Sequence, residues 1–144
     1  MKITADTNLL LRAILEDDAA QAEEAQTLIN QAELVAVPVV VFCEMVWTMR
    51  RLYKRSVEDI GDAIEALLQV ETVVTDRPAV EAGIEVLRRG GDFADGVIAW
   101  HGMGLGGTVL ATFDRAGIRF LESAGLQAAE PATLMSKNRL PGNG

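Results

Sequence analysis

The chain contains a single cysteine and a single histidine, and this scarcity excludes several kinds of site. One cysteine can form neither a disulfide framework nor a cysteine-based zinc cluster. The longest apolar run, residues 34–43, is broken by Pro38 and is too short to span a bilayer. The first residues, 1–6, lack the long apolar segment of a signal peptide. These features predict a cytoplasmic protein without a membrane-spanning segment.

Basic residues are also scarce, since 13 Lys and Arg stand against 21 Asp and Glu, for a net charge of −8. A chain this acidic has no general electrostatic attraction for nucleic acid. Two interpretations follow: either its partners are not polyanions, or some of the acids form a metal site and binding is local. The length of 144 residues, with 49% apolar and 24% charged side chains, suits one globular domain with a buried core.

Short apolar runs alternate with segments of helical spacing. The pattern predicts strands at 2–5, 34–37, 71–74, 108–111 and 126–128, and helices at 7–15, 19–31, 39–53, 56–68, 76–89 and from 92 to the glycines at 102–107. Strands that alternate with helices favour parallel pairing, so the predicted fold class is α/β, with a mainly parallel central sheet flanked by helices. Residues 1–135 form the predicted domain, and residues 136–144 a flexible C-terminal tail.

Several acids lie close to predicted strand ends, where open parallel sheets form their sites. Asp6 directly follows the first strand, and Asp114 lies just past the strand at 108–111. Asp92 and Asp95 lie in the first turn of the helix before that strand. Glu44 stands inside an apolar segment, where a carboxylate needs a partner.

Each of these acids also has a purely structural interpretation. Asp6 and Asp92 are favourable helix N-caps, and Asp95 suits the positive end of a helix. Asp114 fits a turn, because Asp-Arg-Ala-Gly is good turn chemistry, and Glu44 fits a buried ion pair or a dimer contact. Taken together, however, carboxylates gathered at one end of a sheet repel unless a cation lies among them. Oxygen ligands without cysteine or histidine suit Mg²⁺ or Mn²⁺, the ions that assist phosphodiester hydrolysis.

Four segments resemble, in order and spacing, the PIN-domain family, and most of all the VapC-type toxins of bacterial toxin–antitoxin pairs. They are residues 3–10 (ITADTNLL), 42–47 (FCEMVW), 91–99 (GDFADGVIA) and 110–114 (LATFD). The resemblance covers about residues 1–135 and implies a single PIN-like α/β/α sandwich. The chain departs from the commoner family pattern in the Gly-Val-Ile-Ala that follows Asp95, where alanine-rich sequence is usual, and in the glycines at 102–107.

The resemblance implies a metal-dependent endoribonuclease. Its four catalytic acids match Asp6, Glu44, Asp95 and Asp114, of which Asp6, Asp95 and Asp114 would hold Mg²⁺ or Mn²⁺. Asp92 matches an additional family acid, and Asn8 and Thr112 match polar positions that orient the acids. Since Asp92 and Asp95 share a helix face, either can be the inner metal ligand, and we favour Asp95.

The resemblance also implies partners, namely an RNA substrate (most commonly transfer RNA in the family), a second copy in a homodimer, and a small VapB-like antitoxin that covers the acidic groove. A candidate RNA-binding strip consists of Arg50, Arg51, Lys54 and Arg55, which pair one turn apart if the helix continues. A solvated helix end explains the same four residues. The sequence does not name the RNA, the number of metal ions or the antitoxin.

Other classes of protein fit less well. An aspartyl-nucleophile phosphatase needs a second Asp two residues after Asp6, where this chain has Asn8. A magnesium-binding signalling domain needs paired acids after the first strand, and Asp6-Thr7 does not supply them. A non-catalytic acidic binding module remains an alternative, because a family resemblance can persist without activity.

Overall fold

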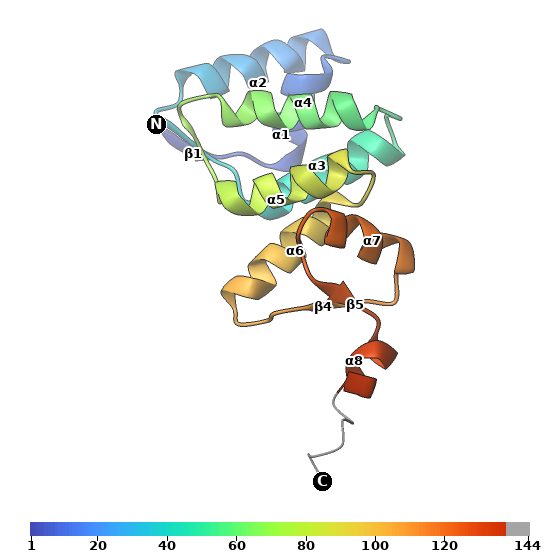
Figure 1. Ribbon diagram of the computed structural model, residues 1–144. Coiled ribbons are helices and arrows are strands. Elements are labelled where there is room, and N and C mark those ends of the chain that lie inside the picture. The colour runs from blue at the N-terminus through green and yellow to red at the C-terminus, as the bar shows by residue number, and fades with distance from the viewer. Residues whose placement is uncertain (138–144) are drawn as a thin grey trace. The chain divides into compact units, whose positions relative to one another are not determined.

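The computed structural model describes residues 1–137, and the chain divides into two compact units, Met1–Val80 and Glu81–Gly144 (Figure 1). Each unit has its own parallel sheet. In chain order the elements are β1 (Lys2–Thr4), α1 (Thr7–Leu15), α2 (Ala19–Gln31), β2 (Leu34–Ala36), α3 (Val39–Arg51), α4 (Val57–Leu68), β3 (Val73–Val74), α5 (Arg77–Arg88), α6 (Phe93–Gly104), β4 (Leu110–Ala111), α7 (Arg115–Ser123), β5 (Ala128–Ala129) and α8 (Pro131–Lys137).

The first unit is built on a three-stranded parallel sheet in the order β1-β2-β3. Val35 of the central strand pairs with Ile3 on one side and with Val73 on the other, and it is fully buried. Helix α1 packs against α2 and α3, and α3 packs against α4. Because β1 and β2 run in parallel, the chain leaves both strands at the same edge of the sheet, and α1 and α3 begin there.

Side-chain caps determine where several helices begin. Asp6 Oδ1 accepts a hydrogen bond from Leu9 N at 2.8 Å and opens α1. Ser56 Oγ accepts one from Asp59 N at 3.1 Å and opens α4, which confirms the predicted start of that helix. These bonds satisfy backbone donors that the first helical turn leaves without a partner.

The second unit contains the two-stranded parallel sheet β4-β5, in which Leu110 pairs with Ala128. Phe93 is fully buried at the start of α6 and lies against Gly83 of α5, where a methyl group would stand 2.6 Å from the ring. The absence of a side chain at Gly83 therefore makes room for this ring. One cluster of buried residues in this unit comprises Val86, Ala99, Leu121, Leu126 and Ala128.

The predicted fold class is confirmed, because the structure is α/β and its strand pairs are parallel. The strands form two separate sheets instead of the single central sheet that we expected. Helices α7 and α8 were not predicted. The proposed tail begins inside α8, which continues to Lys137, and residues 138–144 lie outside the described part of the chain.

Within residues 1–137, none of the helices combines the length and the apolar character that crossing a membrane requires.

Candidate active site

Asp6 lies where β1 gives way to α1. Its hydrogen bond from Leu9 N makes it the N-cap of α1, so the structural interpretation of this residue is correct. The bond occupies only one of the roughly four lone-pair positions of a carboxylate. Because the side chain is also exposed, Asp6 can cap the helix and still offer oxygen to a ligand.

A groove of about 520 Å³ opens beside Asp6, between α1 and α2. Asn8, predicted to orient the acids, and Arg12 also line it. Arg12 Nη1 donates a hydrogen bond to Asp17 Oδ1 at 3.0 Å, and this bond holds the pKa of Asp17 below its ordinary value. Since the charge of Arg12 is paired with Asp17, the carboxylate of Asp6 remains available in this groove.

Glu44 is exposed, which excludes the buried ion pair, one of the two structural interpretations of this residue. Helix α3 turns one apolar face inward and leaves Glu44 on its outer face with Val40 and Trp47, which are 61% and 57% exposed. The partner of Glu44 is Thr7, whose Oγ1 donates a hydrogen bond to Glu44 Oε2 at 2.6 Å. Because Thr7 follows Asp6 directly, this bond fixes the Glu44 carboxylate to the start of α1.

Asp95 in the second unit is crowded by two other carboxylates. It is partly buried in the first turn of α6. Burial raises the pKa of Asp95 above its ordinary value, and the negative charges of Asp92 and Asp114 raise it further. The ionised form of Asp95 is therefore unfavourable here unless a cation compensates its charge.

The two neighbours of Asp95 are both helix caps. Asp92 Oδ1 accepts a hydrogen bond from Ala94 N at 3.1 Å and opens α6, as predicted. Asp114 Oδ1 accepts one from Gly117 N at 3.0 Å and opens α7. Asp114 thus caps a helix, so its structural interpretation as a turn residue is wrong.

Thr112 and Gly117 shape the surroundings of Asp114. Thr112 Oγ1 accepts a hydrogen bond from the backbone N of Asp114 at 3.1 Å. A methyl group on Gly117 would lie 2.7 Å from Asp114 Oδ2 and 3.4 Å from Asp95 Oδ2. Both carboxylates therefore converge on the first turn of α7, in space that only a glycine leaves open.

The predicted basic strip has a different geometry from the one expected. Helix α3 ends at Arg51, and Lys54 has a left-handed backbone with φ of 52°. The backbone N of Arg55 instead bonds to the carbonyl O of Met49 at 2.9 Å. Arg50 and Lys54, like Arg51 and Arg55, are therefore not paired one turn apart on a helix, although all four residues are exposed.

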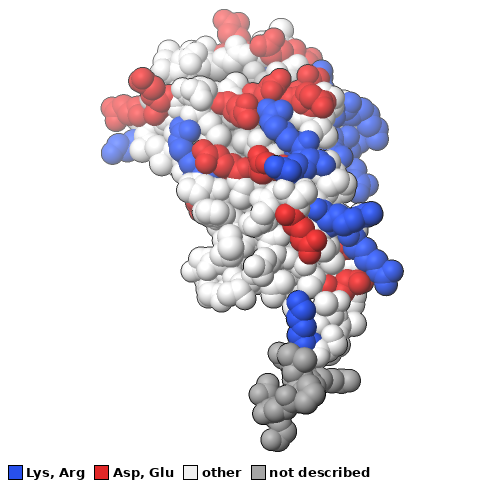
Figure 2. Space-filling model, in the orientation of Figure 1, with Lys and Arg blue, Asp and Glu red and all other residues white. Residues whose placement is uncertain are grey.

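Two further cations lie close to the acids of the second unit in sequence. Arg115 and Arg119 are one turn apart on the unpredicted helix α7, and both are exposed. Arg115 Nε donates to Glu130 Oε1 at 2.9 Å. The sequence signal for this helix was an N-capping Asp114 followed by apolar Ile118 and Leu121 at helical spacing. Figure 2 shows Lys and Arg gathered in patches on the visible face despite the net charge of −8.

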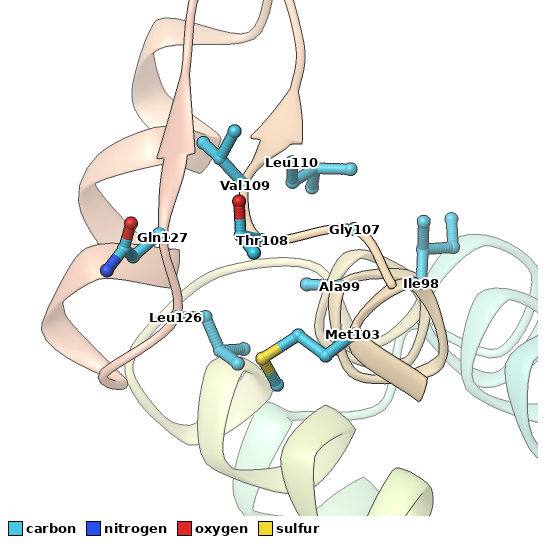
Figure 3. Close-up of a pocket in the computed structure, with 10 residues that line it drawn as sticks. Ile98, Ala99, Met103, Gly107, Thr108, Val109, Leu110, Leu126 and Gln127 are labelled. Carbon is cyan, nitrogen blue, oxygen red and sulfur yellow. The ribbon is translucent and has the colours of Figure 1, made fainter. Parts of the chain in front are cut away.

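An apolar cavity of about 110 Å³ lies in the second unit, between α6 and the segments that enter β4 and β5 (Figure 3). Met103, Leu110 and Leu126 line it, and Thr108 and Gln127 supply polar side chains. None of the lining residues ionises, so this cavity offers neither an acid–base pair nor a metal ligand.

The donor chemistry of the candidate residues fits a hard divalent cation. Aspartate oxygens are the ligands that Mg²⁺ and Mn²⁺ prefer, and a cation would relieve the repulsion at Asp95. The side chains are not arranged as a complete ligand set, since no group of three or more His, Cys, Asp or Glu in the described residues 1–137 could hold a metal ion. The structure brings Asp95 together with Asp92 and Asp114 in one unit, and Glu44 together with Thr7 beside Asp6 in the other.

Comparison with known proteins gives one family. The sequence profile described as PIN domain matches residues 3–122, a range that includes every candidate acid. No curated protein matches the chain.

Proposed function

Because the chain belongs to the PIN-domain family, whose members are generally nucleases that act on RNA, we propose that it is a metal-dependent endoribonuclease. Its substrate would be a structured RNA such as transfer RNA. In a cell it would act in the cytoplasm as the toxin of a VapBC-like pair. The single observation that carries the proposal is the gathering of the Asp95 and Asp114 carboxylates at Gly117. Burial, and then the charges of Asp92 and Asp114, raise the pKa of Asp95 there.

The proposed roles of the acids follow from their surroundings. Asp6, Asp95 and Asp114 would hold the ion, with Asp95 rather than Asp92 as the inner ligand. Glu44, bonded to Thr7, would act as the fourth catalytic acid, and Asn8 and Thr112 would orient the carboxylates. Bound Mg²⁺ or Mn²⁺ would supply activation of a water molecule and neutralisation of charge on the scissile phosphate.

The proposed partners are a VapB-like antitoxin and a second copy of the chain. A basic segment of an antitoxin suits a protein of net charge −8, because complementary charge accelerates and orients association. RNA is a polyanion and is repelled by a net negative charge, so an RNA-binding surface on this protein needs local cations. The exposed side chains of Arg50, Arg51, Lys54 and Arg55 are one proposed source of these cations.

The main alternative is a non-catalytic acidic binding module. Calorimetric titration with Mn²⁺ separates the two functions, since a module without a metal site gives no heat of binding. A phosphatase or a signalling domain would leave RNA intact under all metal conditions.

The proposal is tested by the Asp6→Asn substitution. Asparagine is as good an N-cap as aspartate, so α1 should form and the thermal midpoint should hold. We expect the wild type to produce new RNA ends only with Mg²⁺ or Mn²⁺, and Asp6→Asn to cleave at least about a hundredfold more slowly. Sequencing of RNA ends from both proteins, with EDTA as the metal-free control, measures this. Cleavage at the wild-type rate by well-folded Asp6→Asn protein contradicts the assignment.

A second prediction concerns Gly117, whose substitution by alanine should weaken metal binding without unfolding the protein. The added methyl group would stand 2.7 Å from Asp114 Oδ2, so this short carboxylate has to move. We expect Mn²⁺ affinity and the cleavage rate to fall by about tenfold, the size found when groups that position metal ligands are altered. The matched control is Gly104→Ala on α6, where no atom lies within 4 Å of the added methyl group. Equal Mn²⁺ affinity in the two variants contradicts the prediction.

A further inference from the structure

Phe113 is the most exposed aromatic side chain that the structure describes, with 83% of its surface accessible. Trp47 and Trp100 are less exposed, at 57% and 39%. An exposed phenyl ring contributes nothing to the core, and its position between Thr112 and Asp114 places it next to one of the candidate acids. The position of Phe113 therefore suggests a role in contacting a ligand rather than in packing.

The backbone on both sides of Phe113 is fixed. Before it, Thr112 N donates to Ala129 O at 3.1 Å, which extends the pairing of β4 with β5. After it, Asp114 N donates to Thr112 Oγ1 at 3.1 Å, and Asp114 also caps α7. Only the two side-chain torsions of Phe113 are left to be ordered on binding, so the entropic cost of using this ring is small.

Cations follow the ring at short intervals along the chain. Arg115 begins α7 and its side chain is 84% exposed, while Arg119 is exposed one turn later. An exposed aromatic ring accompanied by arginines is the combination with which proteins bind single-stranded nucleic acid, since the ring stacks on a base and the cations contact phosphates. Bases inside a duplex cannot stack in this way.

We propose that Phe113 is a stacking platform for an unpaired base of the RNA substrate, with Arg119 contacting the adjoining backbone. This inference rests on the proposed function, because it assigns an RNA ligand to the surface beside Asp114. The inference assigns to Phe113, which is not one of the candidate acids, the selection of unpaired over paired RNA. An apolar anchor for a protein partner is the competing role of an exposed Phe.

The experiment measures binding of a fluorescent single-stranded oligoribonucleotide, and of the corresponding duplex, to the full-length chain in EDTA. Binding is then observed without cleavage. We expect Phe113→Ala to weaken single-strand affinity by about 5- to 150-fold, the range found for base–aromatic stacking. Phe113→Trp should retain the affinity, and Phe113→Leu should lose nearly as much as Phe113→Ala, because leucine is apolar but cannot stack. The duplex should bind more weakly than the single strand and should be insensitive to Phe113→Ala.

The matched control is Leu105→Ala, which removes another apolar side chain of the second unit, 90% exposed, and should leave RNA affinity unchanged. Arg119→Ala should reduce the slope of log affinity against log salt by about one. A Phe113→Ala affinity within twofold of the wild type overturns the proposal, as does full affinity in Phe113→Leu or a wild type that binds no RNA. Binding that depends on Phe113 in a protein that never cleaves RNA supports the stacking role and refutes the nuclease function.

Discussion

We expect Asp95→Asn to abolish the proposed RNA cleavage and at the same time to make the metal-free protein more stable. Asparagine keeps the shape of the side chain but removes the charge that burial, Asp92 and Asp114 all oppose. We expect cleavage with Mg²⁺ to fall at least about a hundredfold. We expect the free energy of unfolding in EDTA to rise on the order of 0.5 kcal/mol, the size measured for partly exposed charge pairs. Thermal unfolding and a cleavage assay on the same preparation measure both effects.

The pH dependence of the stability gain has a definite sign. The pKa of Asp95 is raised in the folded state, so the folded protein binds its proton more tightly than the unfolded chain does. The destabilising charge is therefore absent below the ordinary aspartate pKa of about 3.9 and fully present above the raised one. The difference in stability between Asp95→Asn and the wild type should be largest at neutral pH and shrink on acidification. Added Mn²⁺ should stabilise the wild type and leave Asp95→Asn unaffected.

Two control variants show whether the effects of Asp95→Asn come from the loss of any negative charge or from the position of Asp95. Asp92→Asn removes a neighbouring charge and keeps the N-cap of α6, since asparagine caps equally well. If Asp95 is the inner ligand, Asp92→Asn should cleave RNA far better than Asp95→Asn. Glu122→Gln removes one charge from the exposed side of α7 and should change neither stability nor cleavage. Equal stability of Asp95→Asn and the wild type in EDTA at neutral pH contradicts the electrostatic argument.

Local chemistry made much of the fold predictable. Asp6, Ser56 and Asp92 are short polar residues placed just before runs of helical spacing, and each caps a helix in the structure. The sequence also indicated parallel pairing correctly, because its predicted strands alternate with helices, and in the structure a helix follows every strand. These features depend on neighbours within a few residues, and therefore they can be read from one sequence.

Features that depend on which face of an element is covered were harder to predict. A buried ion pair was one structural interpretation of Glu44, because the residues around it are apolar, yet α3 leaves Val40 and Trp47 exposed beside it. Asp114 was interpreted as a turn residue, because Asp-Arg-Ala-Gly suits a turn as well as the first turn of a helix. Because α7 was not predicted, the convergence of Asp95 and Asp114 on Gly117 was not predicted either. This convergence depends on contacts between residues distant in sequence.

Gly96→Ala is expected to destabilise the protein more than Gly102→Ala or Gly117→Ala, although alanine is the better helix former. A methyl group on Gly96 would lie 2.6 Å from the carbonyl O of Ala82 and 2.9 Å from Val86 Cγ2. The obstacle is backbone of α5, which cannot rotate away as a side chain can, so α5 and α6 have to separate. We expect a loss of about 1–3 kcal/mol in the free energy of unfolding. The thermal midpoint should fall by several degrees.

Gly102→Ala on the same helix is the matched control for Gly96→Ala. No atom lies within 4 Å of the methyl group added at Gly102, so only helix propensity acts there, and stability should rise by about 0.5–1 kcal/mol. Because Gly96 follows Asp95 directly, movement of α6 should also lower Mn²⁺ affinity in Gly96→Ala but not in Gly102→Ala. The close backbone of α5 leaves no room for a side chain at Gly96. This gives a physical reason why glycine stands after Asp95, where the commoner family pattern is alanine-rich. A thermal midpoint of Gly96→Ala that equals or exceeds that of the wild type contradicts the close approach of α5 and α6. The placement of Asp95 depends on this approach.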